Sequence, residues 1–271
     1  FHGGGIYNND GTSPTLTGCT FDGNSADYGG GMHNYHASPE LTDCTFDGNS
    51  ADYGGGMYND GSSPTLANCA FSGNSAGFQG GGMRNAGSSS PVLTNCTFEG
   101  NSAVGNGGGM CNTGSSSPVL TNCTFEGNSA YRGGAMHNWS SSPTLTNCIL
   151  WGDTPQEMYN YDLDSSPHVS YSDVQGGCET IWGNVCGTGN IDADPWFVDP
   201  DNSDLHLGTC SRCIDRGDNL APDLPDSDFE GDDRIVDGDD DGAATVDMGV
   251  DEVVGGMPCF HLYLPAVLRG Y

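Results

Sequence analysis

The chain has no lysine and few other cationic side chains. Its 271 residues include six basic residues, all arginine, against 36 Asp and Glu, which gives a formal net charge of −30. Nucleic acid, anionic membranes and acidic polysaccharides repel such a polyanion, so these partners are disfavoured. The sequence also has no apolar run near the roughly 18 residues that a bilayer-spanning helix needs, so no membrane span is expected.

Large aliphatic side chains are scarce as well, and with this charge their scarcity would normally indicate disorder. The sequence has no initiator Met and no signal peptide, so we expect a processed or trimmed chain. Twelve Cys are unusual for a reduced cytosolic enzyme. They favour a secreted protein in an extracellular or cell-surface setting.

Order is supplied instead by an internal repeat of about 25 residues. A Cys recurs at one position of the repeat: Cys19, Cys44, Cys69, Cys96, Cys123 and Cys148. A Leu stands three residues before each Cys, and a Phe stands two residues after each of the first five. A second column reads Ile6, Met32, Met57, Met83, Met110 and Met136, with an Asn two residues after each member.

This spacing predicts an all-β fold, a parallel β-helix of about 7–8 coils. Cys and Phe are two residues apart and face one side of a short strand, whereas Leu and Cys are three apart, so a bend must separate them. Asn68, Asn95, Asn122 and Asn147 occupy this bend, where Asn tolerates left-handed geometry. We expect repeats over residues 1–175, final coils and Asp-rich calcium-type loops over 176–252, and an apolar tail over 253–271. This tail is a cap, a sorting tail or a strand added to the next subunit.

Two sets of motifs carry a resemblance to known families. The Gly-Gly-Gly-Met and Phe-x-x-Asn motifs (residues 21–24 and 98–101, for example) resemble the repeats of polymorphic outer-membrane proteins, which are surface-exposed adhesins. Residues 190–199, 214–218 and 247–252 are similar to bacterial right-handed β-helix proteins of the choice-of-anchor type. The resemblance implies a right-handed coil, export and a surface location, and it implies no shared activity.

The strongest chemical signal is acidic. Alternating carboxylates precede a Gly twice, and the residues involved are Asp226, Asp228, Glu230, Asp237, Asp239, Asp241 and Asp247. Such loops wrap a hard cation with oxygen ligands, so we expect calcium as a cofactor. The alternative is a solvated acidic linker that holds no ion.

The cysteines divide into two groups. Those in the repeat column are expected to be buried free thiols, because they lack the local spacing of metal ligands and their parallel side chains suit a disulfide poorly. Cys178 and Cys186 bracket a short loop and are predicted to form a disulfide. Cys210 and Cys213 form C-S-R-C, either a redox motif or a structural bond, and an exported setting favours the bond. Cys111 and Cys259 have no obvious partners.

The residue between each Met and its Asn is predicted to point outward. This surface stripe reads Tyr7, His33, Tyr58, Arg84, Cys111, His137 and Tyr159. Its rings can stack on sugars or on another chain. Alternatively, they stack only on one another.

No catalytic arrangement is visible, because the arginines are scattered and no acidic pair recurs across the strands. We therefore expect a non-enzymatic structural or adhesive protein. The open first coil and the apolar tail suggest head-to-tail polymerisation into a filament, so the partners are further copies of the chain or cell-surface glycans. The alternatives are a carbohydrate-binding module or, less favoured, a polysaccharide lyase or hydrolase.

Overall fold

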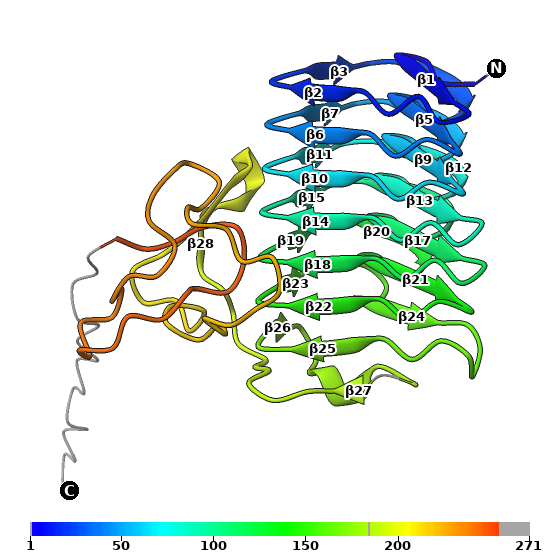
Figure 1. Cartoon of the computed structure of the whole chain (residues 1–271). Coiled ribbons are helices and arrows are strands. Elements are labelled where there is room, and N and C mark those ends of the chain that lie inside the picture. Colours follow the sequence, from blue (N-terminus) through cyan, green and yellow to red (C-terminus); the bar gives the residue numbers. More distant parts are fainter. Residues whose placement is uncertain (1, 184, 255–271) are drawn as a thin grey trace, which may run out of the picture.

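The computed structural model describes residues 2–183 and 185–254, and its main feature is a rod of about seven stacked coils (Figure 1). Each complete coil contributes one strand to each of four parallel sheets, which we name after their inward-facing residues. The predicted all-β parallel β-helix is confirmed. Among the described residues, no helix is long and apolar enough to cross a bilayer.

The Met sheet contains β1 (Ile6–Asn9), β5 (Met32–Tyr35), β9 (Met57–Asp60), β13 (Met83–Ala86), β17 (Met110–Thr113), β21 (Met136–Trp139) and β24 (Met158–Asn160). The Leu sheet contains β2 (Thr15–Thr17), β6 (Glu40–Thr42), β10 (Thr65–Ala67), β14 (Val92–Thr94), β18 (Val119–Thr121), β22 (Thr144–Thr146), β25 (His168–Ser170) and β27 (Val185–Cys186).

The Phe sheet contains β3 (Thr20–Asp22), β7 (Thr45–Asp47), β11 (Ala70–Ser72), β15 (Thr97–Glu99), β19 (Thr124–Glu126), β23 (Ile149–Trp151) and β26 (Asp173–Val174). The Ala sheet contains β4 (Ser25–Tyr28), β8 (Ser50–Tyr53), β12 (Ser75–Gln79), β16 (Ser102–Asn106) and β20 (Ser129–Arg132). Two short 3-10 helices, η1 (Cys178–Thr180) and η2 (Pro200–Asn202), and one antiparallel pair, β28 (Phe197–Asp199) with β29 (Asp204–Leu207), follow the coils.

Identical residues stack along the core. Neighbouring Phe rings lie parallel, with centroids 4.6 Å apart for Phe46 and Phe71. The Met, Leu, Cys and Phe columns form one buried cluster. The bend residues Asn68, Asn95 and Asn122 have left-handed φ of 53°, 51° and 51°, as predicted.

Two ladders of Asn side chains run along the rod. One follows the Met column, where each Nδ2 donates to the next Oδ1, at 2.8 Å from Asn34 to Asn59. The other comprises Asn24, Asn49, Asn74, Asn101 and Asn128, and it ends at Asp153. The sequence does not predict the second ladder, because the Gly-Asn-Ser-Ala segments that supply it are equally typical of simple turns.

Residues 191–254, which we call the C-terminal lobe, begin with Ile191 paired in parallel with Asp173 at the end of the Phe sheet and then lie beside the rod (Figure 1). They cover the bends between the Leu and Phe sheets, where Asn122 Nδ2 donates to the carbonyls of Asp247 and Gly249. Arg234 Nη2 donates to Asn95 Oδ1 at 2.7 Å. The predicted apolar tail lies outside the described residues from position 255 onward.

Candidate functional site

Two columns of side chains face each other across the Gly corner between the Ala and Met sheets. The Ala-sheet column reads Tyr28, Tyr53, Gln79, Asn106 and Arg132, paired in register. The Met-sheet column is the predicted stripe, also in register. Gly29 turns this corner at a φ of +61°, and a Cβ there would collide with the carbonyl oxygen of Met32. Only Gly therefore brings the two columns this close. We call the space between them the aromatic groove.

The rings in the groove stack on one another. Tyr28 stacks on Tyr53 and Tyr58 with centroids 5.6 Å apart in both cases, and Tyr53 stacks on Phe78 at 5.2 Å. As a result the predicted stripe is not an exposed ladder: His33, Tyr58 and His137 are only 3%, 8% and 1% exposed. The alternative prediction, that outward rings stack on one another, describes most of this stripe. The Ala-sheet column was missed, although a Tyr directly before two of the Gly triplets, at Tyr28 and Tyr53, was a usable signal.

The two buried histidines are neutral at pH 7. Burial lowers the pKa of His33 and of His137 to about 4 in each case. Neither ring nitrogen of His33 has a hydrogen-bond partner. The positive charge in this groove therefore comes from its arginines.

One part of the groove is open to a ligand. A hollow of about 430 Å³ is lined by Tyr28, Tyr53, Tyr58, Phe78, Gln79, Arg84, Gly105 and Asn106. Phe78 is 53% exposed. The Arg84 guanidinium lies 4.8 Å from the ring centroid of Tyr53 and 5.4 Å from that of Tyr58. The hollow thus combines ring faces, side-chain amides and a guanidinium.

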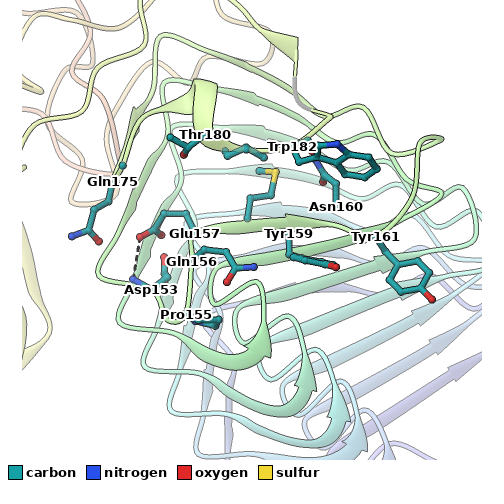
Figure 2. A pocket seen from close by; sticks show the side chains of 13 residues that line it. Asp153, Pro155, Gln156, Glu157, Tyr159, Asn160, Tyr161, Gln175, Thr180 and Trp182 are labelled. Atoms are coloured by element: carbon teal, nitrogen blue, oxygen red, sulfur yellow. Dashed lines mark hydrogen bonds between the residues drawn. The ribbon is translucent and has the colours of Figure 1, made fainter.

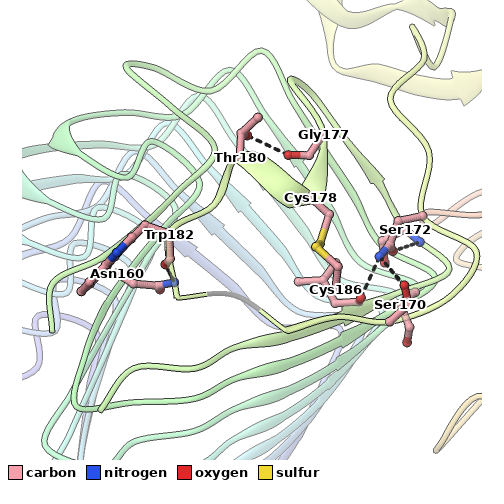
Figure 3. Close-up of a disulfide and its surroundings, with 11 residues drawn as sticks. Asn160, Ser170, Ser172, Gly177, Cys178, Thr180, Trp182 and Cys186 are labelled. Carbon is pink, nitrogen blue, oxygen red and sulfur yellow. Dashed lines mark hydrogen bonds between the residues drawn. A yellow bond between two sulfur atoms is a disulfide. The ribbon is translucent and has the colours of Figure 1, made fainter. Parts of the chain in front are cut away.

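A larger pocket of about 700 Å³ lies at the C-terminal end of the rod (Figure 2). Tyr159 continues the groove into it, and Tyr161 and Trp182 add two exposed rings. Asn160 Nδ2 donates to the carbonyl of Trp182 at 2.6 Å and so fixes the loop that carries this ring. The same loop is tied by the predicted disulfide between Cys178 and Cys186, which is confirmed (Figure 3).

Two buried carboxyl groups line the inner part of this pocket. Asp153 Oδ1 accepts bonds from the backbone N–H and Nδ2 of Asn128, while Glu157 Oε1 accepts from the backbone N–H of Asp153. Asp153 Oδ2 and Glu157 Oε2 have no hydrogen-bond partner. Burial raises the pKa of Asp153 to about 6 and, together with the Asp153 charge, that of Glu157 to about 11. The pair therefore keeps one proton at neutral pH.

The structure brings together only some of the acidic residues that were predicted to bind calcium. Asp237 and Asp239 lie together with Asp215, with one carboxylate oxygen from each within 4.8 Å of the others. Asp228 is buried, and its Oδ1 accepts three backbone N–H groups of residues 230–232. Asp247 is likewise buried and accepts backbone N–H groups from Asp215 and Val253.

The remaining members of the predicted calcium loops place no carboxylate in this cluster, although the backbone N–H of Asp241 donates to Asp237 and Asp239. Asp226 accepts the backbone N–H of Arg234 through its own carbonyl, and Asp241 Oδ1 accepts the N–H of Ala243. Glu230 lies beside His206, which also bonds Asp204. These bonds, that of Glu230 foremost, raise the pKa of His206 to about 9, so this cluster contains a cationic imidazolium at neutral pH. Asp215, Asp237 and Asp239 are the better oxygen set for a hard cation.

The remaining cysteine predictions have mixed outcomes. The column cysteines are free thiols, as expected, and all except the half-buried Cys19 are buried. The proposed bond between Cys210 and Cys213 is wrong. Cys213 is a buried free thiol whose Sγ donates to Asp173 Oδ2 at 3.2 Å, while Cys210 is disulfide-bonded elsewhere. Cys111 is free and buried 3.8 Å from His137 Nδ1, and Cys259 lies outside the described residues.

The repeat sequence, the parallel coils and the stacked core define a β-helix protein. The family model described as "Right handed beta helix region" matches residues 1–150, and the chain belongs to this family. No curated protein and no solved structure matches the chain.

Proposed function

We propose that the protein is an extracellular, non-enzymatic adhesive β-helix that binds glycans in the aromatic groove. The observation that carries this proposal is the pair of ring-bearing columns held face to face by the Gly corner. Tyr and Phe rings offer flat apolar faces on which the C–H face of a sugar stacks, and the rotamers of these rings are already fixed by neighbours. Gln79 and Asn106 add amides for sugar hydroxyls.

The shape of the rod fits a chain-like ligand. Because the columns are in register, each coil repeats the same groove about 4.8 Å further along the rod. The hollow beside Phe78 and the pocket beside Trp182 then become two parts of one extended surface. The resemblance to adhesin repeats and the high Cys content support the extracellular setting.

Glycan-array binding followed by calorimetry tests this proposal. Phe78→Ala and Trp182→Ala each remove an exposed ring from the groove or its end pocket, and we expect each to weaken binding about five- to tenfold. Phe229→Ala, which removes an exposed ring of the C-terminal lobe, is the matched control and should bind like the parent. Absence of binding to any glycan, or equal loss in all three variants, would refute the proposal.

The same experiment separates binding from catalysis. We expect a bound oligosaccharide to be recovered at its original size after prolonged incubation. Shortened or unsaturated products would instead identify a lyase or hydrolase, and the carboxyl pair of Asp153 and Glu157 would then be the first residues to substitute.

A further inference from the structure

The cationic side chains of the rod are all on one face. Within residues 2–175 the only Lys or Arg residues are Arg84 and Arg132, and both lie in the aromatic groove. Arg84 packs on Tyr53 and Tyr58, and Arg132 lies 5.0 Å from the ring centroid of Tyr159. Two cations placed at random on a rod that carries mostly acidic charge would not be expected to share one groove.

Neither guanidinium is used to neutralise an acidic residue. In the described part of the chain, the Arg side chain that forms an ion pair is Arg234, and neither Arg84 nor Arg132 has a carboxylate oxygen within 4.0 Å. Arg84 Nη2 makes one long bond of 3.4 Å to Thr113 Oγ1, and its Nε has no partner. Stacking holds the flat faces of the guanidinium and leaves N–H donors at its edge. Such a fork matches a carboxylate with two parallel bonds.

We propose that the aromatic groove selects a carboxylate-bearing glycan, with Arg84 and Arg132 each binding an acid group while the rings stack on the sugars. This inference rests on the proposed glycan binding and specifies the class of glycan. The register places Gln79, beside Arg84, two coils from Arg132. The two cations are therefore separated by roughly 10 Å along the rod.

The net charge of −30 argues against an acidic polymer only if that charge is spread evenly. More than half of the acidic residues lie in the C-terminal lobe. This lobe covers the bends between the Leu and Phe sheets, on the side of the rod away from β12 and β13 (Figure 1). At physiological salt, exposed charges are screened beyond about 8 Å. The carboxylates of the lobe are therefore largely screened from the two guanidinium groups of the groove.

Calorimetry with matched oligosaccharides tests this selectivity on the full chain. The probes are oligogalacturonate, oligomannuronate and hyaluronate fragments, each compared with its carboxyl-reduced, neutral counterpart. We expect at least one acidic probe to bind about tenfold more tightly than its reduced form. Arg84→Gln and Arg132→Gln should each remove most of this difference, so that the acidic probe binds little more tightly than its reduced form.

Three controls accompany these variants. Arg212→Gln removes an exposed guanidinium of the C-terminal lobe and should leave the selectivity intact. Thermal unfolding of each variant shows whether loss of the Arg–Tyr stacking has disturbed the fold, and Arg84→Lys, which keeps the charge but not the fork, should retain part of the selectivity.

The possible failures are distinguishable. Equal affinity of acidic and reduced probes, or selectivity that survives both Gln substitutions, would overturn the acidic-glycan inference and leave glycan binding in place. Absence of binding to acidic and neutral probes alike would overturn the proposed function as well.

Discussion

At the scale of single residues, Asp153 differs from the Asn residues of the ladder that it terminates, because it carries a carboxyl group in place of a side-chain amide. From Asn49 onward, each ladder Asn uses Nδ2 to donate to a Phe carbonyl and to the next Oδ1, as Asn128 does toward Phe98 and Asp153. Asp153 has an oxygen, Oδ2, where those residues have a donor. Burial of this carboxyl group without a donor raises the pKa of Asp153 to about 6.

This arrangement predicts that the free energy of unfolding depends on pH. With a folded-state pKa raised from 3.8 to about 6, Asp153 keeps a proton that the unfolded chain has released, so stability falls as pH rises from about 4 to about 6. Asp153→Asn restores the donor and should raise stability at pH 7 by about 1–3 kcal/mol, with little effect at pH 4. Urea unfolding at both pH values measures this, with exposed Asp164→Asn as control. Lower stability of Asp153→Asn at pH 7 would contradict the account.

Calcium binding stays a prediction, and the structure changes which substitutions we expect to weaken it. Asp239→Ala should weaken calcium binding measured by calorimetry, because Asp239 shares a cluster with Asp215 and Asp237. Asp228→Ala should instead lower stability, since the Asp228 carboxylate satisfies buried backbone N–H groups. Absence of heat on adding calcium to the parent chain would end the calcium proposal.

The sequence predicts the positions of those residues that pack against the equivalent residue of the next coil. The Cys, Phe and bend-Asn columns could be placed because each copy meets the same residue one coil later. Asp228, Asp247 and Cys213 could not be placed, because their partners come from segments without repeat spacing.

At the scale of elements, one buried cation joins the C-terminal lobe to the rod, in addition to the bonds that Asn122 and Asn147 donate to the lobe. Arg234 is 1% exposed and donates to Asn95 Oδ1, to the carbonyls of Gly249, Val250 and Asp251, and to Glu252 Oε2. It therefore joins the lobe to a bend of the rod and also organises the lobe itself. This role of Arg234 could not be predicted, because the bends follow the repeat spacing whereas the lobe has no repeat.

We predict that Arg234→Met releases the lobe from the rod. The substitution leaves several buried acceptors and Glu252 without a donor, a loss of about 3 kcal/mol or more. Limited proteolysis should then cut within residues 191–254 much faster while the coils stay resistant. Arg212→Met is the exposed control, and an unchanged cleavage pattern for Arg234→Met would show that other contacts hold the lobe.

At the scale of the whole molecule, charge and shape are divided between two sides of the rod. One side carries the acidic lobe, and the other carries the groove with its rings and arginines. This division is invisible in the net charge, which had disfavoured acidic glycans. The stripe could be predicted because the register between coils follows from the repeat. The burial of its side chains could not be predicted, because it depends on how closely the Gly corner brings the facing column.

Head-to-tail assembly into a filament stays a prediction at this scale. At the C-terminal end of the rod, the disulfide-bonded loop of Cys178 and Cys186 covers part of the cross-section, so stacking would have to include or displace this loop. Electron microscopy with and without a calcium chelator tests assembly. Long rods lost in chelator would support it, and single particles in both conditions would remove it.

A crystal structure of the chain with the oligosaccharide that binds most tightly tests the central claim most directly. The account predicts electron density for sugar rings along the aromatic groove, stacked on Phe78 or Trp182, with an acid group at Arg84 or Arg132. Sugar density on the C-terminal lobe, or on another face of the rod with the groove filled only by solvent, would contradict it.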